Sequence, residues 1–201
     1  PEKIRKVVSM TVLKGMDLLI KKKKNNERLS KTYVIDPRKL VYIPFKINSY
    51  DYVMRQETSD GGYIFSGGRS RRDYKTLIDA TKDLPFPVKI VTPREKERKI
   101  QGTFLDERSL SPNVEVINDN GSIESFVSYI ANSRLVVLPL KADDFASTGT
   151  SVYLLAMALK KCVIISSGPT TDGILTEDIA VMVSPKDPKA LRCAIEKVFN
   201  D

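Results

Sequence analysis

The amino-acid sequence predicts an α/β fold built on a doubly wound parallel sheet. Short apolar runs, typical of buried strands, alternate with segments whose apolar residues recur at helical spacing. About six strands are expected, and strands that alternate with helices form parallel sheets. The clearest unit lies in residues 133–167, which read strand, loop, helix, strand.

Residues 1–44 are expected to hold two short strands, at 16–20 and at 40–43, the second of which ends at Pro44. A lysine run at 21–24 and a short helix capped by Asn25 or Asn26 are expected between them. The lysines could bind an anionic membrane at about 1 kcal/mol each, but a solvated surface run is the preferred interpretation. Residues 45–62 lack a helical period and are interpreted as a linker or hinge.

A regular alternation of strands and helices begins at Tyr63 and defines a domain over residues 63–201. Strands are expected at 63–65, 88–91, 114–117, 135–138, 163–165 and 179–183. Helical spacing of apolar residues predicts helices over 74–81, 123–130, 152–159 and 191–198. Asp187 and Pro188 suit the N-cap and the first turn of the last helix.

The composition excludes several kinds of chemistry. The 201 residues contain no histidine, which removes Ser-His-Asp and Cys-His nucleophiles and most zinc sites. Cys162 and Cys193 lack the spacing of a metal site or a disulfide framework and are expected to be reduced packing residues. No apolar run approaches the roughly 18 residues of a spanning helix, and the first residues lack a signal-peptide layout, so a cytoplasmic location is expected.

The net charge of +8 favours anionic partners, which include nucleotide phosphates, acidic lipid head groups and nucleic acid. Two loops suit a phosphate: residues 67–73, with two glycines and three arginines, and residues 146–151, which are small and rich in hydroxyls. Both loops follow strands of a parallel sheet and therefore lie on its carboxyl edge, as in a nucleotide diphosphate site. Dinucleotide and P-loop motifs are absent, so NAD and ATPase functions are disfavoured.

Several motifs occur together in an order known from one enzyme family. They are GGRSRRDYKTLIDA at 67–80, STGTS at 147–151, LAMAL at 155–159, VIISS at 163–167 and VSPKDPKAL at 183–191. With GMDLLI at 15–20, NERLS at 26–30 and YIPF at 42–45, they resemble GT-B glycosyltransferases, chiefly the donor-binding C-terminal domain. The resemblance implies that residues 1–44 are the tail of an N-terminal domain, 45–62 the linker, and 63–201 a Rossmann-like donor-binding domain.

The resemblance also implies a nucleotide-diphosphate sugar as the donor substrate, an unknown glycan or lipid-linked acceptor, and no metal or other cofactor. The implied donor-binding residues hold the diphosphate, the base or the sugar hydroxyls, while catalytic residues stay unidentified. They are Gly67, Gly68, Arg69 and the auxiliary Arg72 at the first loop, Thr148, Gly149, Thr150 and Ser151 at the helix start, Thr92 and Ile117 near the base, and Asp144. Asp143 and Asp144 could bind sugar hydroxyls or be solvated loop acids.

Two departures from the family pattern keep alternatives open. A glutamate that many members use on the ribose is Leu155 here, and an earlier glutamate of the pattern is Ser147. The family also builds its cleft from two full domains, and this chain has only the end of the first. The alternatives to a donor half of a glycosyltransferase are therefore a non-catalytic nucleotide-sugar or anion-binding module and a basic protein that binds membranes or nucleic acid. The last ranks third because no aromatic residues interleave with the basic ones.

Overall fold

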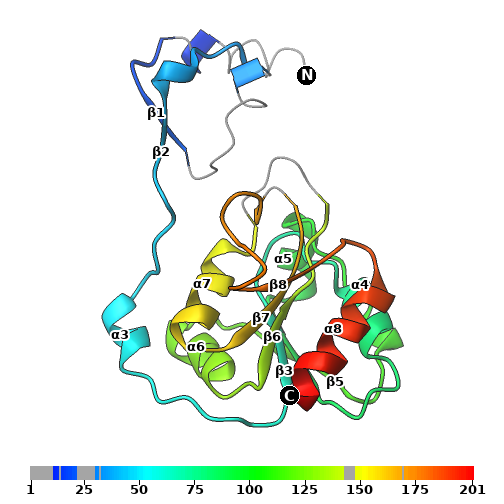
Figure 1. Cartoon of the computed structure of the whole chain (residues 1–201). Coiled ribbons are helices and arrows are strands. Elements are labelled where there is room, and N and C mark those ends of the chain that lie inside the picture. Colours follow the sequence, from blue (N-terminus) through cyan, green and yellow to red (C-terminus); the bar gives the residue numbers. More distant parts are fainter. Residues whose placement is uncertain (1–10, 14, 22–29, 32, 143–147, 169) are drawn as a thin grey trace. The chain divides into compact units, whose positions relative to one another are not determined.

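The computed structural model describes residues 11–201 except 14, 22–29, 32, 143–147 and 169 (Figure 1). The chain divides into two compact units, Pro1–Phe45 with Asp172–Ile174, and Lys46–Thr171 with Leu175–Asp201. Within the described residues, no helix is both long enough and apolar enough to cross a membrane.

The smaller unit contains two short parallel strands, β1 (Leu19–Lys21) and β2 (Leu40–Tyr42). A 3-10 helix, η1 (Pro37–Lys39), directly precedes β2. Asp36 begins this helix, because its carboxylate accepts the backbone N–H of Arg38 at 2.9 Å. Both expected strands are present, although each is shorter than the apolar run that predicts it. The lysines at 22–24 and the start of the helix expected after Asn25 or Asn26 lie outside the described residues, while residues 30, 31 and 33 are described and helical.

The larger unit is built on a six-stranded parallel sheet with the order β5-β4-β3-β6-β7-β8. The expected fold class, a doubly wound parallel sheet, is confirmed. The strands are β3 (Ile64–Gly67), β4 (Val88–Thr92), β5 (Val114–Asn118), β6 (Leu135–Leu138), β7 (Cys162–Ser166) and β8 (Val181–Val183). Strand order runs outward in both directions from the adjacent pair β3 and β6. In such sheets ligands bind at the carboxyl ends of the strands, near the point where the strand order reverses.

Helices cover both faces of this sheet, with α6 and α7 on one face and α4 and α8 on the other (Figure 1). The α-helices of this unit are α3 (Tyr50–Met54), α4 (Tyr74–Thr81), α5 (Glu95–Ile100), α6 (Ile123–Ala131), α7 (Thr150–Ala158) and α8 (Pro188–Asn200), and a 3-10 helix, η2 (Glu107–Ser109), follows α5. Side-chain caps begin three of them, since Asp73, Ser122 and Asp187 accept backbone N–H groups three residues ahead. These caps stand directly before the helices that the apolar spacing predicts.

Two α-helices of the larger unit were not expected. Helix α3 lies in the segment interpreted as an irregular linker, and α5 follows β4. Each has at most six residues, and the α5 sequence EKERKI is almost wholly charged, so neither shows an apolar period. Their stability comes from tertiary packing, for example at Val53 of α3, which is 1% exposed.

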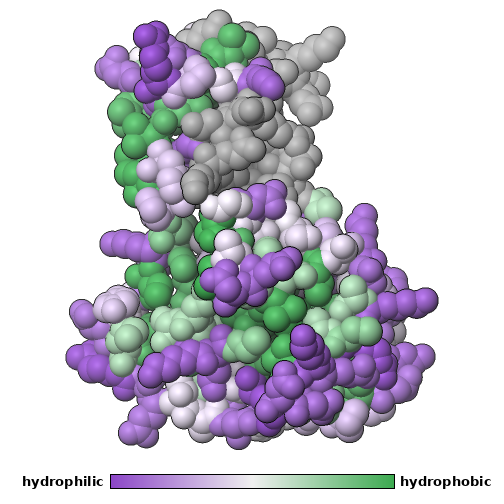
Figure 2. All heavy atoms as spheres, viewed as in Figure 1, coloured by the Kyte–Doolittle hydropathy of each residue, from purple (hydrophilic) through white to green (hydrophobic). Residues whose placement is uncertain are grey.

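The core lies on both sides of the sheet because strand side chains alternate between faces. Ile64 packs into the main apolar cluster with residues of α4 and α8, including Leu77 and Ile195. The next residue, Phe65, points to the other face and meets Phe126 of α6 edge to face at a centroid distance of 5.4 Å. Figure 2 shows polar side chains along the rim of the larger unit on the face in view, with apolar ones nearer its middle.

The two cysteines differ from expectation in one respect. Both are free thiols, but both are exposed, so a packing role for them is wrong. Cys162 begins β7, where its own side chain remains at the surface while the following residues are buried.

Tyr63 directly precedes β3, and its pKa predicts that the protein loses stability at high pH. Its hydroxyl donates to the Tyr129 carbonyl at 2.7 Å, and burial, followed by the nearby Tyr129, raises the pKa of Tyr63 to about 12. The unfolded chain loses this proton near pH 10, whereas the folded protein keeps it, so the stabilisation is complete below pH 10 and declines as the pH rises towards 12. We expect a loss of about 1 kcal/mol at pH 11, after allowance for solvent screening.

Urea unfolding at pH 9 and pH 11 measures this effect. Tyr63→Phe is the control, because it removes the titrating group and keeps the ring. The loss of stability between the two pH values should be smaller in this variant than in the wild type. An equal loss in both proteins would show that Tyr63 does not titrate differently on folding.

Candidate functional site

A pocket of about 420 Å³ lies at the carboxyl edge of the sheet in the larger unit. Its walls come from the loop after β3, the loop between β5 and α6 with the start of α6, and the start of α7. The lining residues are Asn48, Gly68, Arg69, Ser70, Arg72, Asp119, Gly121, Ser122, Ile123, Phe126, Thr148, Gly149, Ser151, Val152 and Leu155. The two loops that the sequence singles out therefore meet in one pocket.

Gly68 directly follows β3 in the first loop, and its backbone conformation and close neighbours require a glycine at this position. Its φ of 118° is unfavourable for other residues, and a Cβ atom at this position would lie 2.2 Å from Nη2 of Arg72. The Gly68 N–H donates to Val91 at 3.1 Å, and its carbonyl accepts the hydroxyl of Thr92 at 3.3 Å. The loop is therefore bound firmly to the end of β4.

Arg72 is 2% exposed, and its positively charged side chain lines this pocket. Its Nε donates to the Gly67 carbonyl and its Nη1 to the Ser70 carbonyl, both at 2.9 Å. Burial lowers the pKa of Arg72, but an arginine stays protonated in proteins. In the part of the chain that the structure describes, no carboxylate pairs with this guanidinium, so an anion in the pocket would compensate its charge.

Arg69 and Asp119 form an ion pair in the lining of the pocket. Arg69 Nε lies 3.3 Å from Asp119 Oδ2, and the side chains are 58% and 8% exposed. The other oxygen of Asp119 accepts the Gly121 N–H at 2.8 Å. Sequence reasoning missed Asp119, although its place directly after β5, on the same sheet edge as the two loops, is a signal that could have identified it.

Helix α7 begins at the pocket without a side-chain cap. Its N-cap is Gly149, with φ of 84°, and no side chain accepts a hydrogen bond there. The first N–H groups of a helix carry partial positive charge and bind anions. Thr148, Gly149 and Ser151 line the pocket, whereas Thr150 is buried and does not.

The remaining predicted residues lie elsewhere. Gly67 ends β3 and is buried, with its carbonyl accepting Nε of Arg72, and Thr92 is buried with its hydroxyl bound to Gly68. Ile117 lies on β5 and is not among the lining residues. Asp144, like Asp143, lies outside the described residues.

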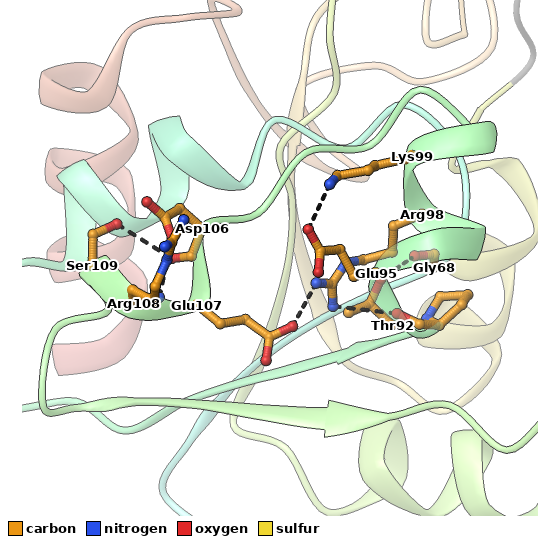
Figure 3. A network of polar contacts seen from close by, with 10 residues as sticks. Gly68, Thr92, Glu95, Arg98, Lys99, Asp106, Glu107, Arg108 and Ser109 are labelled. Carbon is orange, nitrogen blue, oxygen red and sulfur yellow. Dashed lines mark hydrogen bonds and ion pairs between the residues drawn. The ribbon is translucent and has the colours of Figure 1, made fainter.

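Polar contacts around the buried side chain of Arg98 lie next to the end of β4, which binds Gly68 (Figure 3). Arg98 is 1% exposed, donates from Nη1 to the Pro93 carbonyl at 3.2 Å and forms an ion pair with Glu107. The contact with Pro93 connects α5 to the residue directly after β4, and the last residue of β4, Thr92, binds Gly68. The network therefore holds the carboxyl end of β4 in place.

Metal ligands do not gather in the described structure: residues 11–201, apart from the gaps given above, contain no group of three or more His, Cys, Asp or Glu side chains that could hold a metal ion.

No family model and no curated protein matches the chain, but solved structures do. A trehalose-6-phosphate synthase, studied for glycosyl transfer with retention using bisubstrate glycomimetics, has 12% identity and a TM-score of 0.66, over 96% of this chain and 55% of that one. The apo form of the lipopolysaccharide outer core galactosyltransferase WaaB has 18% identity and a TM-score of 0.59, over 92% of this chain and 53% of that one. A UDP-forming α,α-trehalose-phosphate synthase from Burkholderia vietnamiensis has 10% identity and a TM-score of 0.61, over 94% and 55%.

The chain thus spans about half the length of these structures. At this level of identity the likeness concerns the fold, and it agrees with the resemblance that the sequence motifs indicate. The observed strand order and the all-parallel sheet agree with a Rossmann-like domain. The larger unit therefore has the fold of the C-terminal Rossmann-like domain of GT-B glycosyltransferases.

Proposed function

We propose that this chain is the donor half of a glycosyltransferase, which binds a nucleotide-diphosphate sugar in the pocket at the carboxyl edge of the sheet. The observation that carries the proposal is the buried charge of Arg72, which lines this pocket without a carboxylate partner in the described structure. Arg69 and the uncapped start of α7 border the same pocket. Similarity to solved glycosyltransferases supports the same general function.

The proposed chemistry is stabilisation of a leaving diphosphate. In sugar transfer the bond between the anomeric carbon and the diphosphate breaks, and negative charge develops on the diphosphate oxygens. Charged guanidinium donors and the first N–H groups of a helix stabilise such a charge without a metal ion. No metal or other cofactor is therefore proposed.

The proposed acceptor is a glycan or a lipid-linked molecule. Sugar transfer is proposed to need a second domain or a partner chain, which supplies the acceptor-binding side of the cleft and any general base. We place the protein in the cytoplasm and propose that the lysines at 22–24 make peripheral contact with an anionic membrane. Lys21 is only 7% exposed and is not assigned to this contact. Nucleic acid is not expected as a partner.

Leu155 favours one alternative, a binding module without transferase activity. This residue lines the pocket where family members have a glutamate for the ribose. The two functions differ in one result: a transferase releases nucleoside diphosphate from a sugar donor when its second domain and acceptor are supplied, and a binding module does not.

Thermal unfolding of the whole chain with UDP, GDP, ADP, dTDP and their sugars tests donor binding. A ligand at about 100 times its dissociation constant adds about 2.7 kcal/mol of stability, which corresponds to a shift of about 5–10 °C for a chain of this size. We expect such a shift with at least one nucleotide class, and about a tenfold weaker affinity in Arg69→Ala, because a charge-assisted contact contributes about 1.5–3 kcal/mol.

Arg108→Ala is the matched control, because Arg108 also pairs with an aspartate but lies outside the pocket. It should bind as the wild type does. The proposal is wrong if no nucleotide shifts the transition, or if both arginine variants bind as well as the wild type.

A further inference from the structure

One wall of the pocket is apolar. It consists of Val152 and Leu155 of α7 and Ile123 and Phe126 of α6. Val152 and Leu155 are only 5% and 6% exposed, and Phe126 is held by its edge-to-face contact with Phe65. The wall is thus a packed surface with little freedom to rearrange.

This wall lies beside the anion-binding end of the pocket. Ser151 and Leu155 are one turn apart on the same face of α7, which separates them by about 6 Å along the helix axis. A phosphate at the start of α7 therefore places the next group of the ligand against Leu155. In a nucleoside diphosphate, the group next to the phosphate is the pentose.

A hydroxyl of that pentose that faces this wall would find no hydrogen-bond partner in it. Aliphatic and phenyl side chains cannot accept its hydrogen bond, and an unsatisfied polar group that loses its water weakens binding. Asp119, the one carboxylate among the described lining residues, already accepts hydrogen bonds from Gly121 and Arg69. A methylene group at the same position would instead gain apolar contact.

We infer that this pocket selects 2′-deoxyribonucleoside diphosphates and their sugar esters over the corresponding ribonucleotides. The inference rests on the proposed function, because it assumes that a nucleoside diphosphate occupies the pocket with its phosphates at α7. It assigns Leu155 as the residue that determines this specificity, at the position where the chain departs from the family pattern.

Calorimetric titration of the whole chain with matched pairs tests the inference. The pairs are dTDP with ribothymidine 5′-diphosphate, dUDP with UDP, and dGDP with GDP, and the members of each pair differ only in the 2′-hydroxyl. The deoxy member of the bound base class should bind about tenfold more tightly, which corresponds to about 1.4 kcal/mol.

Leu155→Gln tests the assignment to one residue. The amide can donate to or accept from a 2′-hydroxyl, so the preference for the deoxy member should fall to about twofold or reverse. Leu155→Met is the control, because it keeps an apolar side chain of similar volume and should keep the preference. If Leu155→Gln fails to fold, the ratio measured for the wild type still decides the inference.

The outcomes separate the two proposals. Equal binding of both members of a pair, or tighter binding of the ribonucleotide, overturns the inference and leaves donor binding intact. A preference that Leu155→Gln retains in full overturns the role of Leu155. No binding of any diphosphate overturns both the inference and the proposed function.

Discussion

Replacement of Gly149 by aspartate is expected to weaken nucleoside diphosphate binding by about 100-fold, or about 2.8 kcal/mol. The new carboxylate would stand at the N-cap of α7 and take the helix N–H groups that we assign to the phosphate. It would also repel the ligand, since like charges about 4 Å apart interact by about 4 kcal/mol at an effective dielectric constant near 20. Calorimetric titration measures the loss.

Gly149→Asn is the matched control for charge. Both variants place a side chain at φ of 84°, and in both a Cβ atom would lie 3.3 Å from the methyl carbons of Leu140. The two therefore share the strain and differ in the negative charge. If aspartate and asparagine weaken binding equally, the phosphate does not lie at the start of α7.

Gly68→Ala is expected to destabilise the protein by about 3 kcal/mol, because strained backbone costs about 1–2 kcal/mol and overpacking about 1–3 kcal/mol. The added methyl would overlap the guanidinium of Arg72, which is buried and bound to two carbonyls and so cannot move aside freely. Urea unfolding measures the stability, and the melting temperature should fall by about 6–12 °C.

Gly62→Ala separates backbone strain from the steric conflict. Gly62 also has a positive φ, of 67°, but a Cβ atom there would meet nothing within 4 Å. The free energy of unfolding of Gly62→Ala should fall only by the cost of the backbone strain, about 1 kcal/mol. A similar loss of stability in both alanine variants would mean that Arg72 gives way easily and that its position in the pocket wall is not rigid.

Most of the larger unit could be predicted from local patterns. Apolar runs and helical spacing predict all six strands of the main sheet and four of its helices, and Asp187 caps α8 as expected. Helices α3 and α5 could not be predicted, since they are short and gain their stability from contacts with distant residues. The side chains of Cys162 and Cys193 likewise show that apolar spacing places a residue on an element without deciding its exposure.

The candidate site was predictable in part for a topological reason. Strands of a parallel sheet end at one edge, so the first loop and the start of α7 were expected together, and Gly68, Arg69, Thr148, Gly149 and Ser151 do line one pocket. Their role in binding stays a prediction. Thr92 and Ile117, expected near the base, are not among the pocket's lining residues, because a strand's last side chains can face a neighbouring strand or helix as well as the edge.

The sequence by itself determined the fold class, the order of the six main strands and four of the helices, and the two loops, because these depend on spacing between near neighbours in the chain. Only the tertiary structure decided that Arg72 is buried without a carboxylate partner in its described surroundings, that Asp119 pairs with Arg69 from another loop, and that Leu155 belongs to an apolar wall. These properties depend on which distant segments pack together, and burial and charge compensation have no counterpart in local spacing.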